Sequence, residues 1–126
     1  MNKIFYCLRL LWVKSMRAGA QLGCHQLPER SFHFKQYQFP VCARCCGVFI
    51  GEIVALLCVF KKKIPPVYAC FVCMLTMFSD WFIQYIEVRE SNNMRRLITG
   101  IVGGFGCWSL ISYVLVTVVR KFKTNK

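Results

Sequence analysis

Acidic side chains are scarce in this chain. Five aspartates and glutamates stand against 17 lysines and arginines in 126 residues, which gives a formal net charge of +12 at pH 7. Charged residues of both signs make up 17% of the chain, less than is usual for soluble domains. The basic residues bracket long apolar runs instead of forming a solvated face of their own. This pattern favours contact with anionic lipid headgroups and argues against a nucleic-acid partner.

The polar, loop-rich composition of a secreted disulfide-bonded domain is also missing. Nine cysteines are present, an odd number, and four of them lie inside apolar runs: Cys58, Cys70, Cys73 and Cys107. A buried thiol ordinarily packs as a small hydrophobic group. The remaining cysteines favour a metal site over disulfides. A Cys24–Cys42 disulfide, or plain buried thiols, is the alternative.

Three apolar runs indicate membrane-spanning helices. Residues 64–86 begin with two prolines and carry one formal charge, whereas residues 97–119 carry none. A third run, residues 46–60, is interrupted only by Glu52 and is short for a span of about 20 residues, so we expect this helix to begin earlier and to cover 41–60. The sequence therefore predicts one all-α membrane domain, residues 1–126, with three transmembrane helices.

An amphipathic helix is predicted for residues 1–20. Arg9, Lys14 and Arg17 interrupt the apolar region that a signal peptide would need. At about 100° per residue, the large apolar side chains fall on one arc of a helix and the basic ones on the other. This pattern is typical of a helix that lies in the membrane interface.

The predicted topology brings the unusual polar segments to one membrane face. The triple lysine at 61–63 and the basic C-terminal tail share one side of the membrane. A Cys/His segment (21–45), the end of the second span and the loop at 87–96 share the other. The positive-inside rule places the triple lysine in the cytoplasm. However, arginines are also present on the Cys/His side, and exposed thiolates survive better in a reducing cytosol, so the orientation stays open.

The Cys/His segment has the spacing of a zinc site. Cys24 and His25 are followed by Cys42 and Cys45, whose C-x-x-C spacing lets two thiolates from one turn bind the same ion. Adjacent residues rarely both bind one ion, so Cys24, Cys42 and Cys45 are the first three ligands. We expect His25 or Asp80 to be the fourth ligand or to hydrogen-bond a ligand.

Two carboxylates and one histidine are the predicted catalytic residues. Asp80 is the only aspartate and lies inside a span, where an ionisable group is a functional candidate. The alternative is that Asp80 pairs with Arg95 or Arg96 and only holds helices together. Glu52 could act as a general base, a metal ligand or a buried partner of an arginine. His25 completes the set.

The start of the third span combines a helix cap with two arginines. The polar residues before it can cap the helix, either alone or together with an anion that binds at the helix N-terminus. Seven residues are predicted to bind an anion: Arg30, Arg44, Ser91, Asn92, Arg95, Arg96 and Thr99.

Small residues recur at helical spacing in two spans. Gly47-x-x-x-Gly51 and Gly100-x-x-x-Gly104 permit close packing of the first and third spans, and such faces could also form an oligomer.

Four segments together resemble a known family. "CHQLPERSF", "QFPVCARC", the intramembrane Asp80 and "SNNMRRLITG" are similar to small bacterial and archaeal membrane proteins grouped as domain of unknown function 2085. The resemblance covers residues 22–104 and implies a multi-helix membrane domain with a Cys/His site. We expect the protein to lie in the cytoplasmic membrane of a bacterium. It implies no activity. Members often carry threonine where this chain has Cys46, which speaks against Cys46 as an obligatory ligand.

Three functions fit these residues. The first is a zinc-dependent hydrolase or transferase that acts on an anionic, phosphate-bearing lipid or a related substrate. The second is a non-enzymatic subunit for interaction or assembly, in which zinc only holds the fold together. The third is a metal or thiol transporter, with ions passing toward Cys70, Cys73 and Met77.

Overall fold

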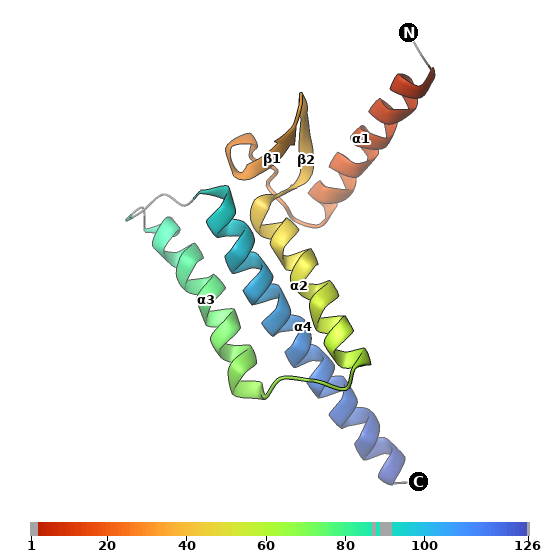
Figure 1. The fold of residues 1–126 in the computed structure, drawn as a ribbon, viewed down its shortest axis with the longest axis vertical. Helices are drawn as coiled ribbons and strands as arrows, with labels where there is room; N and C mark the ends of the chain where they lie inside the picture. Colours follow the sequence, from red (N-terminus) through yellow and green to blue (C-terminus); the bar gives the residue numbers. More distant parts are fainter. Residues whose placement is uncertain (1–2, 87, 89–91, 126) are drawn as a thin grey trace.

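Four helices and one short hairpin make up the structure (Figure 1), a computed structural model that describes residues 3–86, 88 and 92–125. In chain order these elements are α1 (Lys3–Gln21), a 3₁₀ turn η1 (Pro28–Arg30), β1 (Ser31–Phe34), β2 (Tyr37–Cys42), α2 (Ala43–Phe60), α3 (Val67–Tyr85) and α4 (Asn93–Thr124). The predicted all-α class is confirmed. The Cys/His segment, predicted as a loop, contains the antiparallel hairpin β1–β2.

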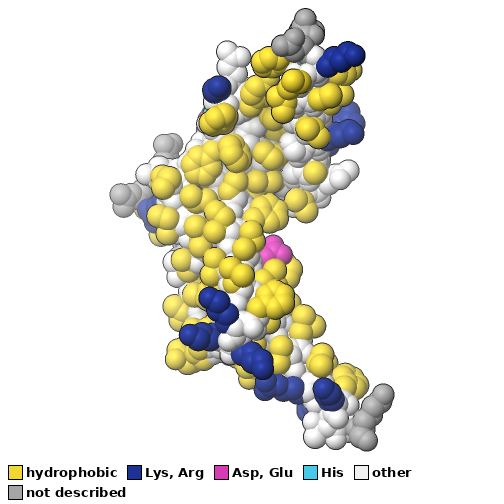
Figure 2. All heavy atoms as spheres, turned by 45° about the vertical axis from the view of Figure 1, so that its right-hand side comes forward, with side chains coloured by type: hydrophobic (Ala, Val, Ile, Leu, Met, Phe, Trp, Pro, Cys, Tyr) yellow, Lys and Arg dark blue, Asp and Glu magenta, His cyan; other side chains and the backbone are white. Residues whose placement is uncertain are grey.

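Helices α2, α3 and α4 are each long and apolar enough to cross a membrane. Their large hydrophobic side chains point outward, and Figure 2 shows such side chains covering the middle of the molecule, with Lys and Arg toward both ends. In a water-soluble domain these side chains would be inside. The chain is therefore a membrane protein with three spans, as predicted.

Helix α4 lies between α2 and α3 (Figure 1) and presents glycine to both. A Cβ on Gly47 or on Gly100 would clash with the backbone of the facing helix, because α2 and α4 are in backbone contact there. On its other side α4 packs Gly103 against Met77 of α3. The predicted close packing of the first and third spans is confirmed. These faces are engaged within one chain, and an oligomer through them stays a prediction.

All three membrane helices differ from the predicted spans by a few residues, and α2 begins at Ala43 instead of residue 41. Helix α3 begins at Val67 with Pro66 as its N-cap, not at residue 64. Proline lacks a backbone N–H and restricts the residue before it, so the helix starts after the pair. Helix α4 covers Asn93–Thr124 instead of 97–119. Lysine and arginine are good helix formers, so the helix continues beyond its apolar section.

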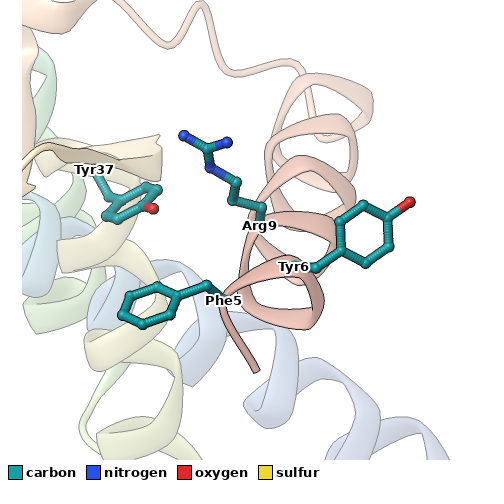
Figure 3. A pocket seen from close by; sticks show the side chains of 4 residues that line it. All are labelled: Phe5, Tyr6, Arg9 and Tyr37. Atoms are coloured by element: carbon teal, nitrogen blue, oxygen red, sulfur yellow. The ribbon is translucent and has the colours of Figure 1, made fainter. Parts of the chain in front are cut away.

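Helix α1 points away from the three spans (Figure 1) and is attached mainly to the hairpin. The indole N–H of Trp12 donates a hydrogen bond to the Gln38 carbonyl oxygen at 2.8 Å. The predicted N-terminal helix is confirmed, and its position in the membrane interface stays a prediction. A hollow of about 240 Å³ lies between α1 and the hairpin (Figure 3), where Arg9 extends toward Tyr37. None of the predicted site residues line it.

Candidate metal centre and cationic cavity

Three cysteines from two separate segments meet at one end of the bundle. The sulfur atoms of Cys24, Cys42 and Cys45 all lie within 4.8 Å of one another, and those of Cys42 and Cys45 are 3.4 Å apart. Tetrahedral zinc holds thiolates about 3.8 Å apart, because each Zn–S bond is about 2.3 Å long. All nine cysteines are free, so the alternative Cys24–Cys42 disulfide is not formed. This cysteine triad has the dimensions of a metal site.

The segment that carries Cys24 is fixed by glutamine side chains. Gln26, with a φ of 50°, donates through Nε2 to a carbonyl oxygen of α1 and to that of Pro40 in β2, both at 2.6 Å. Gln38 in turn donates to the Gln26 carbonyl oxygen at 2.7 Å. The backbone N–H of Cys42 donates to the sulfur of Cys24 at 3.1 Å. The triad is thus held in place by hydrogen bonds of the protein itself.

Cys42, which precedes the first residue of α2, has an acidic thiol. It is the N-cap of α2, at the positive end of that helix. The Cys45 thiol hydrogen-bonds its thiolate and the first N–H groups of α2 interact with it, and these effects outweigh the opposing effect of burial. The pKa of the Cys42 thiol is therefore lowered to about 5. A thiolate at neutral pH is the form that binds metals.

His25 and Cys46 lie outside the triad. The His25 side chain is exposed and lines the same cavity as the cysteines, but it is not among the groups close enough to share an ion. Cys46 instead directs its thiol to the Val41 carbonyl oxygen, at 3.8 Å. Among the described residues, the close group therefore offers three sulfur ligands and leaves a fourth position to His25 or to another molecule.

An open cavity of about 1020 Å³ lies beside the triad. Three arginines from three different elements line it together with the cysteines: Arg30 from η1, Arg44 from α2 and Arg96 from α4. The other lining residues are Gly23, His25, Gln26, Leu27, Glu29, Trp81, Gln84 and Tyr85. Thiols and guanidinium groups thus face one shared space.

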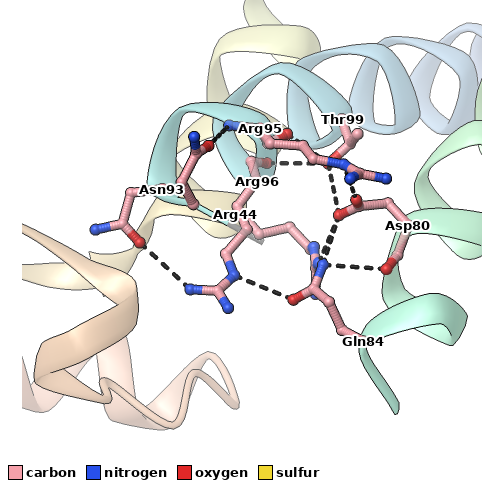
Figure 4. A network of polar contacts seen from close by, with 8 residues as sticks. Arg44, Asp80, Gln84, Asn93, Arg95, Arg96 and Thr99 are labelled. Atoms are coloured by element: carbon pink, nitrogen blue, oxygen red, sulfur yellow. Dashed lines mark hydrogen bonds and ion pairs between the residues drawn. The ribbon is translucent and has the colours of Figure 1, made fainter. Parts of the chain in front are cut away.

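The intramembrane Asp80 is surrounded by cations and polar groups (Figure 4). Arg44 Nη2 lies 3.0 Å from Oδ2, and Arg95 Nε lies 2.6 Å from Oδ1 in an ion pair that is not aligned as a hydrogen bond. Gln84 donates to Oδ2 at 2.7 Å and Thr99 at 3.4 Å. Asp80 is 3% exposed and does not line the cavity. This placement favours the structural alternative, in which Asp80 joins helices.

Arg96 is a buried guanidinium for which the described residues supply no ion-pair partner. Only 9% of it is exposed, and it donates to Gln84 Oε1 at 3.1 Å and to Asn93 Oδ1 at 3.4 Å. Within the described part of the chain, neither ion pair involves it. Buried charges are normally paired, so Arg96 leaves a positive charge at the cavity wall.

The remaining predicted residues have other places. Asn92 caps α4, since its Oδ1 accepts from the backbone N–H of Arg95 at 2.8 Å. Arg95 and Thr99 belong to the Asp80 network and do not line the cavity. Glu52 is half-buried in α2 away from the cavity, and Ser91 lies outside the described residues.

Seven cavity residues were not predicted: Gly23, Gln26 and Leu27 of the cysteine segment, and Glu29, Trp81, Gln84 and Tyr85. Gln84 follows Asp80 by one helical turn, a spacing that places both on one face, and this was the available signal. The aromatic pair at the end of a span resembles an ordinary interfacial belt, and Glu29 follows a proline in a polar turn. Nothing in the sequence alone distinguishes Trp81, Tyr85 and Glu29 from residues with these ordinary structural roles.

Residues 24–110 match the family described as "Predicted membrane protein (DUF2085)". The chain belongs to this family. The matched residues include the cysteine triad, Arg30, Arg44, Asp80 and the start of α4. The resemblance identified from the four motifs is therefore confirmed.

Two relatives of this DUF2085 protein are archaeal. An uncharacterised protein of Methanothermobacter thermautotrophicus is 39% identical over 87 residues, which cover 66% of this chain and 78% of the relative. An uncharacterised protein of Methanocaldococcus jannaschii is 36% identical over 112 residues, which cover 81% of this chain and 70% of the relative. No solved structure matches. A membrane location is supported, whereas the expected bacterial origin is not, since these relatives are archaeal.

Proposed function

We propose that this protein is a membrane-embedded zinc hydrolase or transferase that acts on an anionic, phosphate-bearing substrate. The observation that carries the proposal is that the cysteine triad and three arginines line one cavity. A site that binds metal only for stability has no need of a neighbouring cationic space. A metal and guanidinium groups together suit a site that acts on phosphate, since both stabilise the negative charge of phosphate oxygens.

The cysteine triad would hold the zinc, and the cavity would hold the substrate. Catalytic zinc sites keep three protein ligands and an open fourth position, where the ion acts as a Lewis acid. Arg30, Arg44 and Arg96 would bind phosphate oxygens, because guanidinium groups match their geometry. His25 and Glu29, the imidazole and the carboxylate that line the cavity, are the candidates for moving protons.

Asp80 takes a positioning role in this proposal. Its carboxylate fixes Arg44 at the cavity wall through the 3.0 Å ion pair. It is not the proton carrier in this proposal, because it does not line the cavity. Glu52 takes no part, since it does not line the cavity.

A non-enzymatic role of the metal is the second candidate. One observation favours it: the triad connects the segment after α1 to the start of α2, so a metal there would cross-link two parts of the fold. If His25 turned inward, three sulfurs and one nitrogen would form a closed structural site. The transporter alternative has less support. Cys70 is buried, and the Cys70–Cys73 turn of α3 packs against Gly106 of α4, as in ordinary helix packing.

The test compares zinc-loaded and zinc-stripped protein in nanodiscs supplied with a panel of phosphate mono- and diester lipids. Phosphate release and product mass are measured. We expect zinc-dependent turnover, reduced about tenfold or more by Arg96→Gln with zinc content unchanged. Arg17→Gln, an exposed cation on α1, is the matched control and should leave turnover unchanged. Absence of turnover, together with unfolding on zinc removal, would instead establish the structural role.

A further inference from the structure

One wall of the cavity is aromatic and continues onto the outer surface of α3. Phe78, Trp81 and Tyr85 are spaced by three and four residues and therefore share a helix face. Their rings form a row, with centroids 5.8 Å apart between Phe78 and Trp81 and 5.3 Å apart between Trp81 and Tyr85. Trp81 and Tyr85 line the cavity, while all three rings are exposed toward the lipid. The cavity and the lipid-facing side of α3 are thus contiguous.

The two walls of this cavity differ in chemistry. The wall formed by η1 and the starts of α2 and α4 carries arginines and thiols, whereas the α3 wall carries Trp81 and Tyr85. An interfacial belt explains aromatic residues at the end of a span. It does not explain why two of them border the same space as the buried Arg96. A phosphate from water uses only the cationic wall, but an anionic lipid uses both.

Resting on the proposed function, we infer that the cavity takes a lipid phosphate laterally from the bilayer. The phosphate enters between α3 and the cysteine segment and binds at Arg44 and Arg96. The acyl chains stay in the membrane and lie along Trp81 and Phe78. The substrate class is then an anionic membrane lipid with a phosphate headgroup, rather than soluble phosphate or a zwitterionic lipid.

Fluorescence of Trp81 tests this route directly. In a Trp12→Phe/Trp108→Phe variant, Trp81 is the only tryptophan. The variant is placed in vesicles of phosphatidylcholine that contain a low fraction of phosphatidic acid, with bromine on the chains of one lipid or the other. Bromine quenches tryptophan only at close contact. We expect quenching by brominated phosphatidic acid to exceed, by about tenfold per molecule, that by brominated phosphatidylcholine.

Two further variants separate the site from general attraction of anionic lipid to a basic protein. Arg96→Gln, which changes a buried cavity residue, should abolish the preference, whereas Arg17→Gln, an exposed residue of α1, should preserve it. A preference that depends on Arg17 and not on Arg96 would overturn the inference. Because Trp12→Phe removes a hydrogen bond to the hairpin, zinc content is measured on every variant to confirm an intact site.

Binding of inorganic phosphate distinguishes this inference from the function on which it rests. Calorimetric titration of the zinc-loaded protein with phosphate measures the affinity of the cationic wall for phosphate, without any contribution from acyl chains. Equal quenching by the two brominated lipids, with phosphate still bound in an Arg96-dependent way, would overturn lateral entry and leave the proposed function standing. Equal quenching without any phosphate binding would overturn both.

Discussion

Arg44 of α2 and Asp80 of α3 form an ion pair, with Nη2 3.0 Å from Oδ2. Arg44 directly precedes Cys45, a member of the cysteine triad. Arg44 also lines the cavity beside the cysteine triad. Its side chain therefore connects this cavity to α3. Asp80 additionally pairs with Arg95 at the start of α4. The Asp80 carboxylate thereby joins α2, α3 and α4 at the end of the bundle that carries the cysteine triad.

Replacing Asp80 should destabilise the fold more than replacing the other carboxylate of the spans. Asp80→Asn leaves Arg44 and Arg95 without their counter-charge, and removing one partner of a buried pair costs about 3–5 kcal/mol. Glu52→Gln is the matched control, because Glu52 makes no ion pair within the described residues. Unfolding in mixed micelles with increasing SDS measures both. Equal stability of the two variants would contradict a structural role for Asp80.

The glycine contact between α2 and α4 should not tolerate a methyl group. A Cβ on Gly100 would clash with the carbonyl oxygen of Arg44, which cannot move without shifting α2. We expect Gly100→Ala to cost about 1–3 kcal/mol, as overpacking does. Ile98→Ala, on an outward position of the same helix, should have a small effect. An unaltered unfolding midpoint in Gly100→Ala would mean that the two helices are farther apart than described.

The acidity of Cys42 predicts how the zinc-free protein reacts with iodoacetamide. Because its pKa is lowered to about 5, the folded protein keeps a thiolate at a pH where an ordinary thiol, with a pKa of about 8.5, is protonated. Alkylation of Cys42, followed by peptide mass spectrometry, should reach half its maximal rate near pH 5. Glutathione in the same buffers provides the ordinary reference. A midpoint for Cys42 that coincides with that of glutathione would contradict the hydrogen-bonded arrangement.

The same shift sets the sign of a pH effect on stability. Between about pH 5 and the ordinary thiol pKa, Cys42 carries a proton in the unfolded protein and is a thiolate in the folded protein. The contribution of Cys42 is therefore fully present above the unfolded pKa and is lost as the pH falls through about 5. Zinc-free protein should become less stable as the pH is lowered from 9 to 5, and Cys42→Ser should reduce this dependence.

His25 decides between the open and the closed metal site. In an open site three sulfurs suffice, so His25→Ala should keep its zinc and unfold at the same temperature as the unaltered protein. In a closed site the imidazole is the fourth ligand, and its loss should lower zinc affinity by about tenfold or more. Competition with a colorimetric chelator measures the affinity. Only the first result fits the proposed hydrolase or transferase.

The spans, the N-terminal helix and the pairing of Cys42 with Cys45 could be predicted from sequence because each depends on local spacing. Apolar runs give the spans, and the C-x-x-C turn brings Cys42 and Cys45 together. The glycines of α2 and α4 likewise predicted which helices would pack closely. That Cys24 lies on the same membrane face as Cys42 and Cys45 followed from the predicted topology.

The hairpin and the cavity could not be predicted in the same way. The strands are short, and their alternating aromatic residues at 32, 34, 37 and 39 are easily overlooked in a cysteine-rich segment. The partner of Asp80 depends on how α2 and α3 are rotated around α4. Sequence spacing suggested Arg95 or Arg96, whereas the structure pairs Asp80 with Arg44 and Arg95. The cavity arises only where several segments meet, which no single pattern encodes.

Zinc content per chain tests the central claim most directly. Elemental analysis is made on protein purified in detergent under reducing conditions, beside Cys24→Ser and Cys46→Ser. Cys24 belongs to the triad, whereas Cys46 is a matched cysteine in the same region that does not. The account predicts about one zinc ion per chain in the unaltered protein and in Cys46→Ser, and almost none in Cys24→Ser. Equal metal content in all three proteins, or no metal in any of them, would contradict it.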